Sequence, residues 1–263
     1  MAAKKTKTLT PAALLLCAVA ALLAVLIFVK LVNPDVKSAE VKYTADAKTA
    51  AVKQGYDDNA FIRISGVLDN KKISSLDEWK ASAQSSVDAS GYFVCDDIVK
   101  VGRSRVRLVI SARKPLLTVS MAGEYVTLDS EGYVLGRAKS YSQADGTILV
   151  QGLALRYVNP GSSAVVESSE QKLTDALKVA SVIRDNALES TYLSFTMLDD
   201  RYVSLKSSSG VPVRINMRFD VLKDLLAARE VLKTGRTGGH IEAVNGNVYF
   251  EPDAEDNYAI TGM

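Results

Sequence analysis

Residues 105–136 read RVRLVISARKPLLTVSMAGEYVTLDSEGYVLG and decide the fold. Apolar and polar side chains alternate along the first eight residues, which is the period of a strand with one buried face. One face carries Val106, Leu108, Ile110 and Ala112, and the other carries Arg105, Arg107, Val109 and Ser111. Turn residues follow at Ala122-Gly123 and at 129–132. The stretch predicts a β-meander that joins a small module to a larger one.

Composition sets limits on function. The chain has 263 residues, a net charge of +2 and 48% hydrophobic residues, so it has no strong electrostatic bias toward nucleic acid. Cys17, Cys95 and the lone His240 provide neither a disulfide framework nor a metal-ligand pattern. No phosphate-binding loop or common hydrolase motif occurs. These observations predict a non-enzymatic protein without cofactor, nucleic acid or small-molecule substrate.

An apolar run lies near the N-terminus. Residues 12–29 carry no polar side chain, and 12–32 would span about 31 Å as a helix, close to the thickness of the hydrocarbon layer. The pattern predicts a single transmembrane helix over 12–32, with a cleaved signal peptide as the alternative. Lys4, Lys5 and Lys7 precede the run. The positive-inside rule then predicts a cytoplasmic tail at 1–11 and an extracytoplasmic part from 33 onward.

The outer part divides into segments. We expect a polar spacer at 33–59 and a small α/β module at 60–115. In that module a short strand at 61–64 precedes a helix that begins after the capping box at Ser75, and strands follow the helix.

The second module is predicted at 116–252 as a mostly antiparallel β-domain with two helices. A capping box at 168–171 and Asp220 mark the helix starts. Asn245-Gly246 predicts a type I′ turn in a final hairpin. Residues 253–263 are expected to be a flexible tail. The fold class is therefore α+β.

Four arginines concentrate positive charge around the strand at 105–112, namely Arg103, Arg105, Arg107 and Arg113. They are either the solvent face of a sheet edge or a docking face for an acidic partner or for lipid headgroups.

The order of parts resembles the bacterial cell-division protein family FtsQ/DivIB, which combines a short basic tail, one anchor, a small POTRA module and a β-domain. LVISARKPLLTV at 108–119 is similar to the strand that ends POTRA in the family. Residues 125–135, 149–153 and 203–253 are similar to its hairpin, its following strand and its C-terminal strands and helix. POTRA modules usually have two helices, whereas the sequence predicts only one here.

The resemblance implies a scaffold of the divisome that joins FtsB/DivIC-type and FtsL-type bitopic proteins and regulates the septal peptidoglycan synthase. It also implies a single-pass protein of the cell membrane, enriched at the septum. In the family the far end of the β-domain binds FtsB/DivIC by strand addition. Carried over to this sequence, that site comprises Ile241, Glu242, Ala243, Val248, Tyr249 and Phe250.

Other functions stay open. One alternative is a membrane-anchored extracytoplasmic regulator of cell-wall enzymes that acts outside division. Another is a membrane-bound sensor, which would need a cytoplasmic domain larger than eleven residues.

Overall fold

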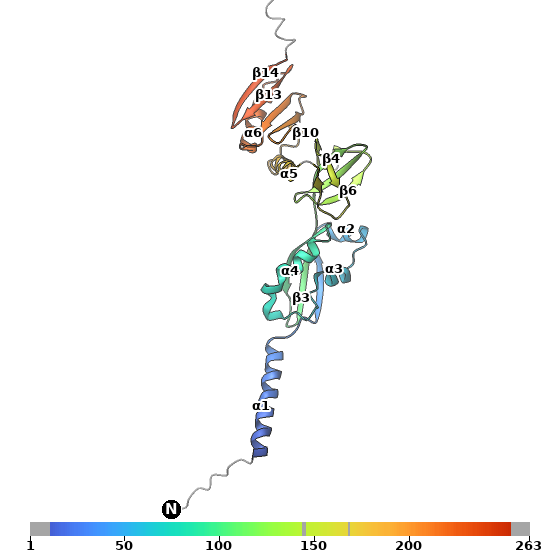
Figure 1. The fold of residues 1–263 in the computed structure, drawn as a ribbon, viewed down its shortest axis with the longest axis vertical. Helices are drawn as coiled ribbons and strands as arrows, with labels where there is room; N and C mark the ends of the chain where they lie inside the picture. The colour runs from blue at the N-terminus through green and yellow to red at the C-terminus, as the bar shows by residue number, and fades with distance from the viewer. Residues whose placement is uncertain (1–10, 144–145, 168, 254–263) are drawn as a thin grey trace, which may run out of the picture. The chain divides into compact units, whose positions relative to one another are not determined.

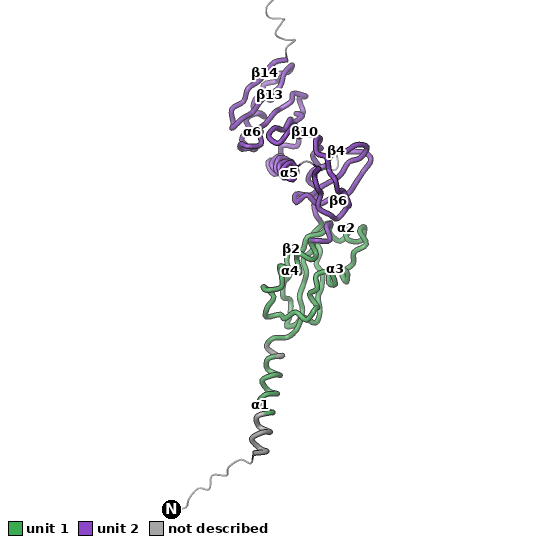
Figure 2. Tube along the Cα trace, viewed as in Figure 1, with its two compact units in different colours: residues 1–88, 93–112 green, residues 89–92, 113–263 purple. Residues whose placement is uncertain are grey.

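The computed structural model describes residues 11–143, 146–167 and 169–253. Residues 1–10 of the expected cytoplasmic tail and 254–263 of the expected flexible tail lie outside the described residues. The chain forms two compact units (Figure 2). Unit 1 comprises residues 1–88 and 93–112, and unit 2 comprises residues 89–92 and 113–263.

The first helix, α1, spans Pro11–Val32. The structure describes its side chains only at residues 19–29. Across the part of the chain that the structure describes, no helix is both long enough and apolar enough to cross a membrane. This finding contradicts the predicted transmembrane helix at 12–32. The fold class is therefore α+β with no transmembrane helix among the described residues.

Unit 1 contains a three-stranded sheet in the order β1-β3-β2. β1 (Ser38–Tyr43) runs parallel to β3 (Arg105–Ala112), and β2 (Phe93–Lys100) runs antiparallel to it. The predicted alternation of β3 is confirmed, because Val106, Leu108 and Ile110 are fully buried.

Helices occupy the chain between β1 and β2, and two sequence predictions need correction there. The elements are α2 (Ala47–Lys53), α3 (Asp58–Ser65), the 3-10 turn Ile73–Ser75 and α4 (Leu76–Asp88). Residues 61–64, predicted as a strand, lie in α3. Asp57 caps that helix by accepting the Ala60 N–H at 2.7 Å, and Gly66 ends it with φ 61°. A short apolar run is ambiguous between strand and helix, so the cap decided the outcome.

The predicted spacer at 33–59 also contains structure, since both β1 and α2 lie within it. β1 pairs along its whole length with β3. An aromatic cluster joins the helices to this sheet, with the Phe61 ring centroid 5.1 Å from that of Phe93 and 5.3 Å from that of Tyr56. The module therefore begins before residue 60.

Unit 2 contains a nine-stranded sheet in the order β14-β13-β12-β11-β10-β7-β4-β5-β6. Within the described residues its pairings are five antiparallel and three parallel. The meander predicted at 105–136 divides between the two units, because its first strand is β3 of unit 1 and the remainder forms β4, β5 and β6. The strands are β4 (Pro115–Met121), β5 (Glu124–Asp129), β6 (Val134–Ala138), β7 (Ile148–Gln151), β10 (Tyr192–Met197), β11 (Tyr202–Ser207), β12 (Pro212–Asn216), β13 (Gly239–Val244) and β14 (Asn247–Pro252). β8 (Leu155–Tyr157) and β9 (Val165–Val166) form a separate pair.

Two helices pack on the nine-stranded sheet, as the sequence predicted. α5 (Glu170–Asp185) contacts β4 and β10, and α6 (Val221–Leu232) contacts β12, β13 and β14 (Figure 1). Their apolar stripes are buried, including Ile183 on α5 and Leu225 on α6. Most residues of β11, β12 and β13 that point away from this core are polar and at least partly exposed, including Ser204, Arg214 and Glu242, as expected for a sheet with one solvated face.

Candidate partner-binding edge

The final hairpin forms as predicted. β13 and β14 pair antiparallel around Asn245-Gly246, whose φ angles are 54° and 80°. Two successive left-handed residues are the geometry of a type I′ turn, and glycine adopts it without steric cost. The turn fixes the register, so that Val244 lies opposite Asn247.

The structure separates the six predicted partner-binding residues into two groups. Ile241, Glu242 and Ala243 lie on β13, which pairs with β12 on one side and with β14 on the other. The backbone of β13 is therefore occupied, and these three residues cannot receive an added strand. Val248, Tyr249 and Phe250 lie on β14, which among the described residues pairs with β13 alone.

The hairpin register determines which backbone N–H and C=O groups of β14 are not hydrogen-bonded to β13. The residues that flank a two-residue turn exchange both of their hydrogen bonds, and such pairs alternate with pairs that exchange none. Asn247, Tyr249 and Glu251 therefore direct their N–H and C=O groups toward β13, whereas Val248 and Phe250 direct theirs outward. The Asp253 N–H continues this alternation by donating to the Gly238 carbonyl at 2.8 Å.

The side chains of β14 divide between two faces. Val248 lies opposite Ala243 and Phe250 opposite Ile241, both of which are buried, so these two side chains share the face that packs against the core. Tyr249 lies opposite Glu242 on the other face and is 60% exposed. The edge of β14 thus exposes the backbone N–H and C=O groups of Val248 and Phe250. The apolar side chains of these two residues lie on one face of the sheet, and Tyr249 lies on the other.

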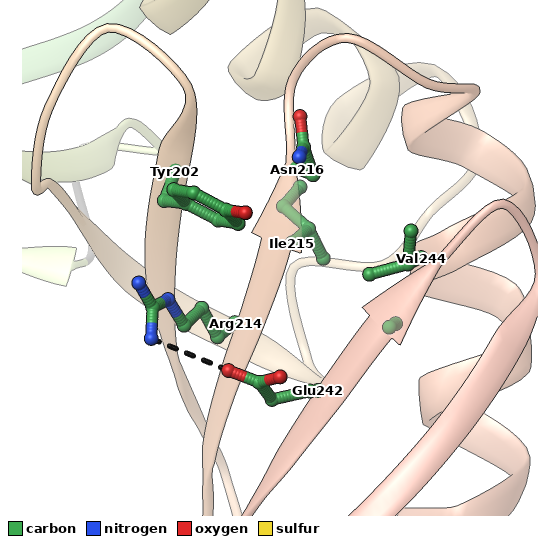
Figure 3. A pocket seen from close by; sticks show the side chains of 7 residues that line it. Tyr202, Arg214, Ile215, Asn216, Glu242 and Val244 are labelled. Carbon is green, nitrogen blue, oxygen red and sulfur yellow. Dashed lines mark hydrogen bonds and ion pairs between the residues drawn. The ribbon is translucent and has the colours of Figure 1, made fainter.

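A polar cluster lies beside Tyr249 on the exposed face. The Arg214 guanidinium is 4.4 Å from the centre of the Tyr202 ring, and its Nη1 is 3.3 Å from Oε1 of Glu242 (Figure 3). Asp199 orients the start of β11 by accepting the N–H groups of Arg201 and Tyr202, and these bonds lower the pKa of Asp199. The cluster neutralises Glu242, so this carboxylate already has a cationic partner.

α6 holds the hairpin from the buried face. Asp220 caps the helix by accepting the Lys223 N–H at 3.1 Å, as the sequence predicted. One turn on, the fully buried Asp224 accepts the Gly246 N–H at 2.5 Å. No motif of the sequence pointed to Asp224, although an aspartate beside Leu225 on an apolar helix stripe is unusual. Tyr192 of β10 also holds α6, since its hydroxyl donates to the Leu225 carbonyl at 2.6 Å.

The four predicted arginines do not form one docking face. Arg113 is buried in unit 2, where its Nη1 lies 2.6 Å from Asp129 Oδ2 and 2.7 Å from Glu131 Oε2. Arg107 lies in unit 1 and pairs with Glu40 at 2.5 Å. Arg103 and Arg105 are exposed in unit 1. The docking interpretation is therefore corrected for Arg113, which is a core ion-pair residue.

The Cys95 thiol is unreactive in the folded protein. Burial, with Asp88 and Asp96 nearby, raises the pKa of Cys95 to about 12, so the thiol stays protonated at neutral pH. Within the described ranges, no three His, Cys, Asp or Glu side chains are placed together to hold a metal ion. His240 instead lies 3.2 Å from Glu251 across the hairpin.

Comparison with family models and with curated proteins found no relative of this chain. Its function is therefore inferred from the order of its parts and from the geometry of the β14 edge.

Proposed function

We propose that this chain is a non-enzymatic scaffold of the bacterial division septum, similar to the FtsQ/DivIB family. It joins FtsB/DivIC-type and FtsL-type division proteins and thereby regulates the septal peptidoglycan synthase. The observation that carries the proposal is the open edge of β14, where the backbone groups of Val248 and Phe250 face outward. Strand addition to such an edge is an established mode of peptide recognition.

The order of elements supports the proposal in unit 1. The resemblance implies a POTRA module with two helices, and the sequence alone indicated only one. Three α-helices, α2, α3 and α4, lie between β1 and β2, so the segment holds the second helix that the resemblance calls for and one short helix more. The segment 108–119, which resembles the strand that ends POTRA, contains the end of β3 and the start of β4, and the boundary between the two units lies between these strands.

The proposal places the protein at the division septum. A fluorescent fusion of the full chain should form a midcell band in dividing cells. A signal spread evenly around the cell, with no band at any stage of constriction, would contradict the division role.

Strand addition at β14 is tested with a substitution that removes an outward-facing backbone N–H donor. Val248→Pro deletes an N–H that does not bond β13, and edge strands tolerate proline at such positions. We expect it to weaken binding of an FtsB/DivIC-type partner at least tenfold with little change in thermal stability. Val248→Ala is the matched control, because it trims the side chain and keeps the N–H.

A second substitution tests the exposed face. Tyr249 is exposed, so Tyr249→Ala should weaken partner binding while unfolding stays unchanged. Equal losses of binding and stability in Val248→Pro and Tyr249→Ala would mean that β14 is only a structural strand, and the proposal would fall.

A further inference from the structure

The β14 edge also carries information about the kind of segment that it accepts. A strand added to β14 alternates its side chains between the two faces of the sheet. Its residues would therefore meet Val248 and Phe250 on one face and Tyr249 and Glu251 on the other. Each face sets its own chemical requirement.

The face toward α6 requires apolar partner residues. Val248 and Phe250 pack against the hydrophobic core but remain partly exposed at the edge. An added strand would place a side chain beside each of them and remove the remaining apolar surface from water, which is favourable. Aliphatic residues fit this face beside Val248, and the Arg236 guanidinium, 5.5 Å from the centre of the Phe250 ring, is the charged group recorded next to it.

The opposite face is aromatic and acidic. Tyr249, Glu251 and Asp253 follow one another along it, and all three are exposed. The segment 247–253 contains no lysine or arginine, and the neighbouring Glu242 is already paired with Arg214. His240 lies beside Glu251 as its cross-strand partner. The outermost surface of this face is thus negative.

That surface favours a cation and disfavours an anion. A lysine or arginine beside Tyr249 can lie over its ring, and the same side chain can approach the Glu251 carboxylate. Like charges on adjacent strands destabilise pairing, so an acidic segment would be rejected as well as poorly bound.

We propose that β14 selects an extended partner segment in which aliphatic residues alternate with lysine or arginine. This inference rests on the proposed strand addition at β14 and adds the chemistry of the partner to it. The occupant is a short, basic, amphipathic strand of a protein partner. It pairs with the outward N–H and C=O groups of Val248 and Phe250.

Two matched peptides test the selection on the full chain by fluorescence anisotropy. One peptide alternates valine with lysine, and the other alternates valine with glutamate. We expect the lysine peptide to bind about tenfold or more tightly than the glutamate peptide. The preference should shrink as salt increases, because the charges are exposed.

Three variants separate the possible outcomes. Glu251→Lys combined with Asp253→Lys should reverse the preference, whereas Glu167→Lys combined with Glu189→Lys, the same charge change at exposed sites outside the hairpin, should preserve it. Val248→Pro should abolish binding of both peptides. Equal affinity for the two peptides, lost in Val248→Pro, would overturn the charge selection and leave strand addition standing. Binding of neither peptide, or binding that Val248→Pro leaves unchanged, would overturn strand addition itself.

Discussion

Removal of the Asp129 carboxylate should be among the most destabilising single changes in unit 2. The Asp129 side chain is 4% exposed and its partner Arg113 is 2% exposed, with 2.6 Å between Oδ2 and Nη1. Asp129 Oδ1 also accepts the N–H groups of Glu131 and Tyr133, at 2.9 and 2.8 Å. One side chain therefore neutralises a buried guanidinium and closes the turn between β5 and β6.

The magnitude follows from what Asp129→Ala leaves behind. Arg113 would keep the Tyr133 ring at 3.9 Å and the largely exposed Glu131, but it would lose its buried counterion. Breaking a buried ion pair by removing one member costs about 3–5 kcal/mol. For a domain of this size, that corresponds to a decrease in Tm of about 10 °C.

The assay is urea unfolding of the full chain, followed by circular dichroism. Trp79, the sole tryptophan, lies in unit 1, so its fluorescence reports that unit separately. Asp129→Asn, which keeps one acceptor oxygen, should cost less than Asp129→Ala. A double-mutant cycle with Arg113→Met should show strong coupling, because the second substitution removes the stranded charge.

A surface control sharpens the test. Arg105 is exposed on β3, so Arg105→Ala should change the free energy of unfolding by less than about 0.5 kcal/mol. A cost below about 1 kcal/mol for Asp129→Ala, similar to that of the control, would refute the buried ion pair and restore Arg113 to the surface.

Two further predictions concern Cys95 and Asp224. In a Cys17→Ser background, Cys95 should react with Ellman's reagent at pH 8 only on unfolding. The pKa of Cys95 is about 12 in the folded state and about 8.5 in the unfolded state. The protonated thiol therefore contributes fully to folding stability below about pH 8.5, and this contribution declines as pH rises toward 12. Cys95→Ala should remove this pH dependence of the melting temperature. Asp224→Ala should cost about 1–3 kcal/mol in urea unfolding because it leaves the Gly246 N–H without its acceptor. Asp224→Asn, which keeps an acceptor, should cost less, and equal losses would contradict the role of this hydrogen bond.

Much of unit 2 could be predicted from local signals. The cap at Asp220 and the Asn245-Gly246 turn each depend on residues close in the chain, and each forms as expected. Unit 1 was less predictable. The apolar residues at 61–64 fit a strand or a helix equally well, and the Asp57 cap made them helical.

The candidate site shows the same division. The sequence predicted the final hairpin but could not tell that β13 lies between β12 and β14, because that pairing joins residues about 28 apart in the chain. It also grouped Arg113 with three other arginines, whereas the fold brings Asp129 and Glu131 to it.

The sequence by itself determined the α+β class, the meander, the two helices of unit 2 and the type I′ hairpin. The tertiary structure decided that β1 completes the sheet of unit 1, that Arg113 is buried, and that Val248 and Phe250 hold the open backbone. The physical reason is that periodicity, caps and turns act over a few residues and leave a local pattern. Strand neighbours and ion-pair partners are chosen by packing between distant segments, and no local pattern encodes that choice.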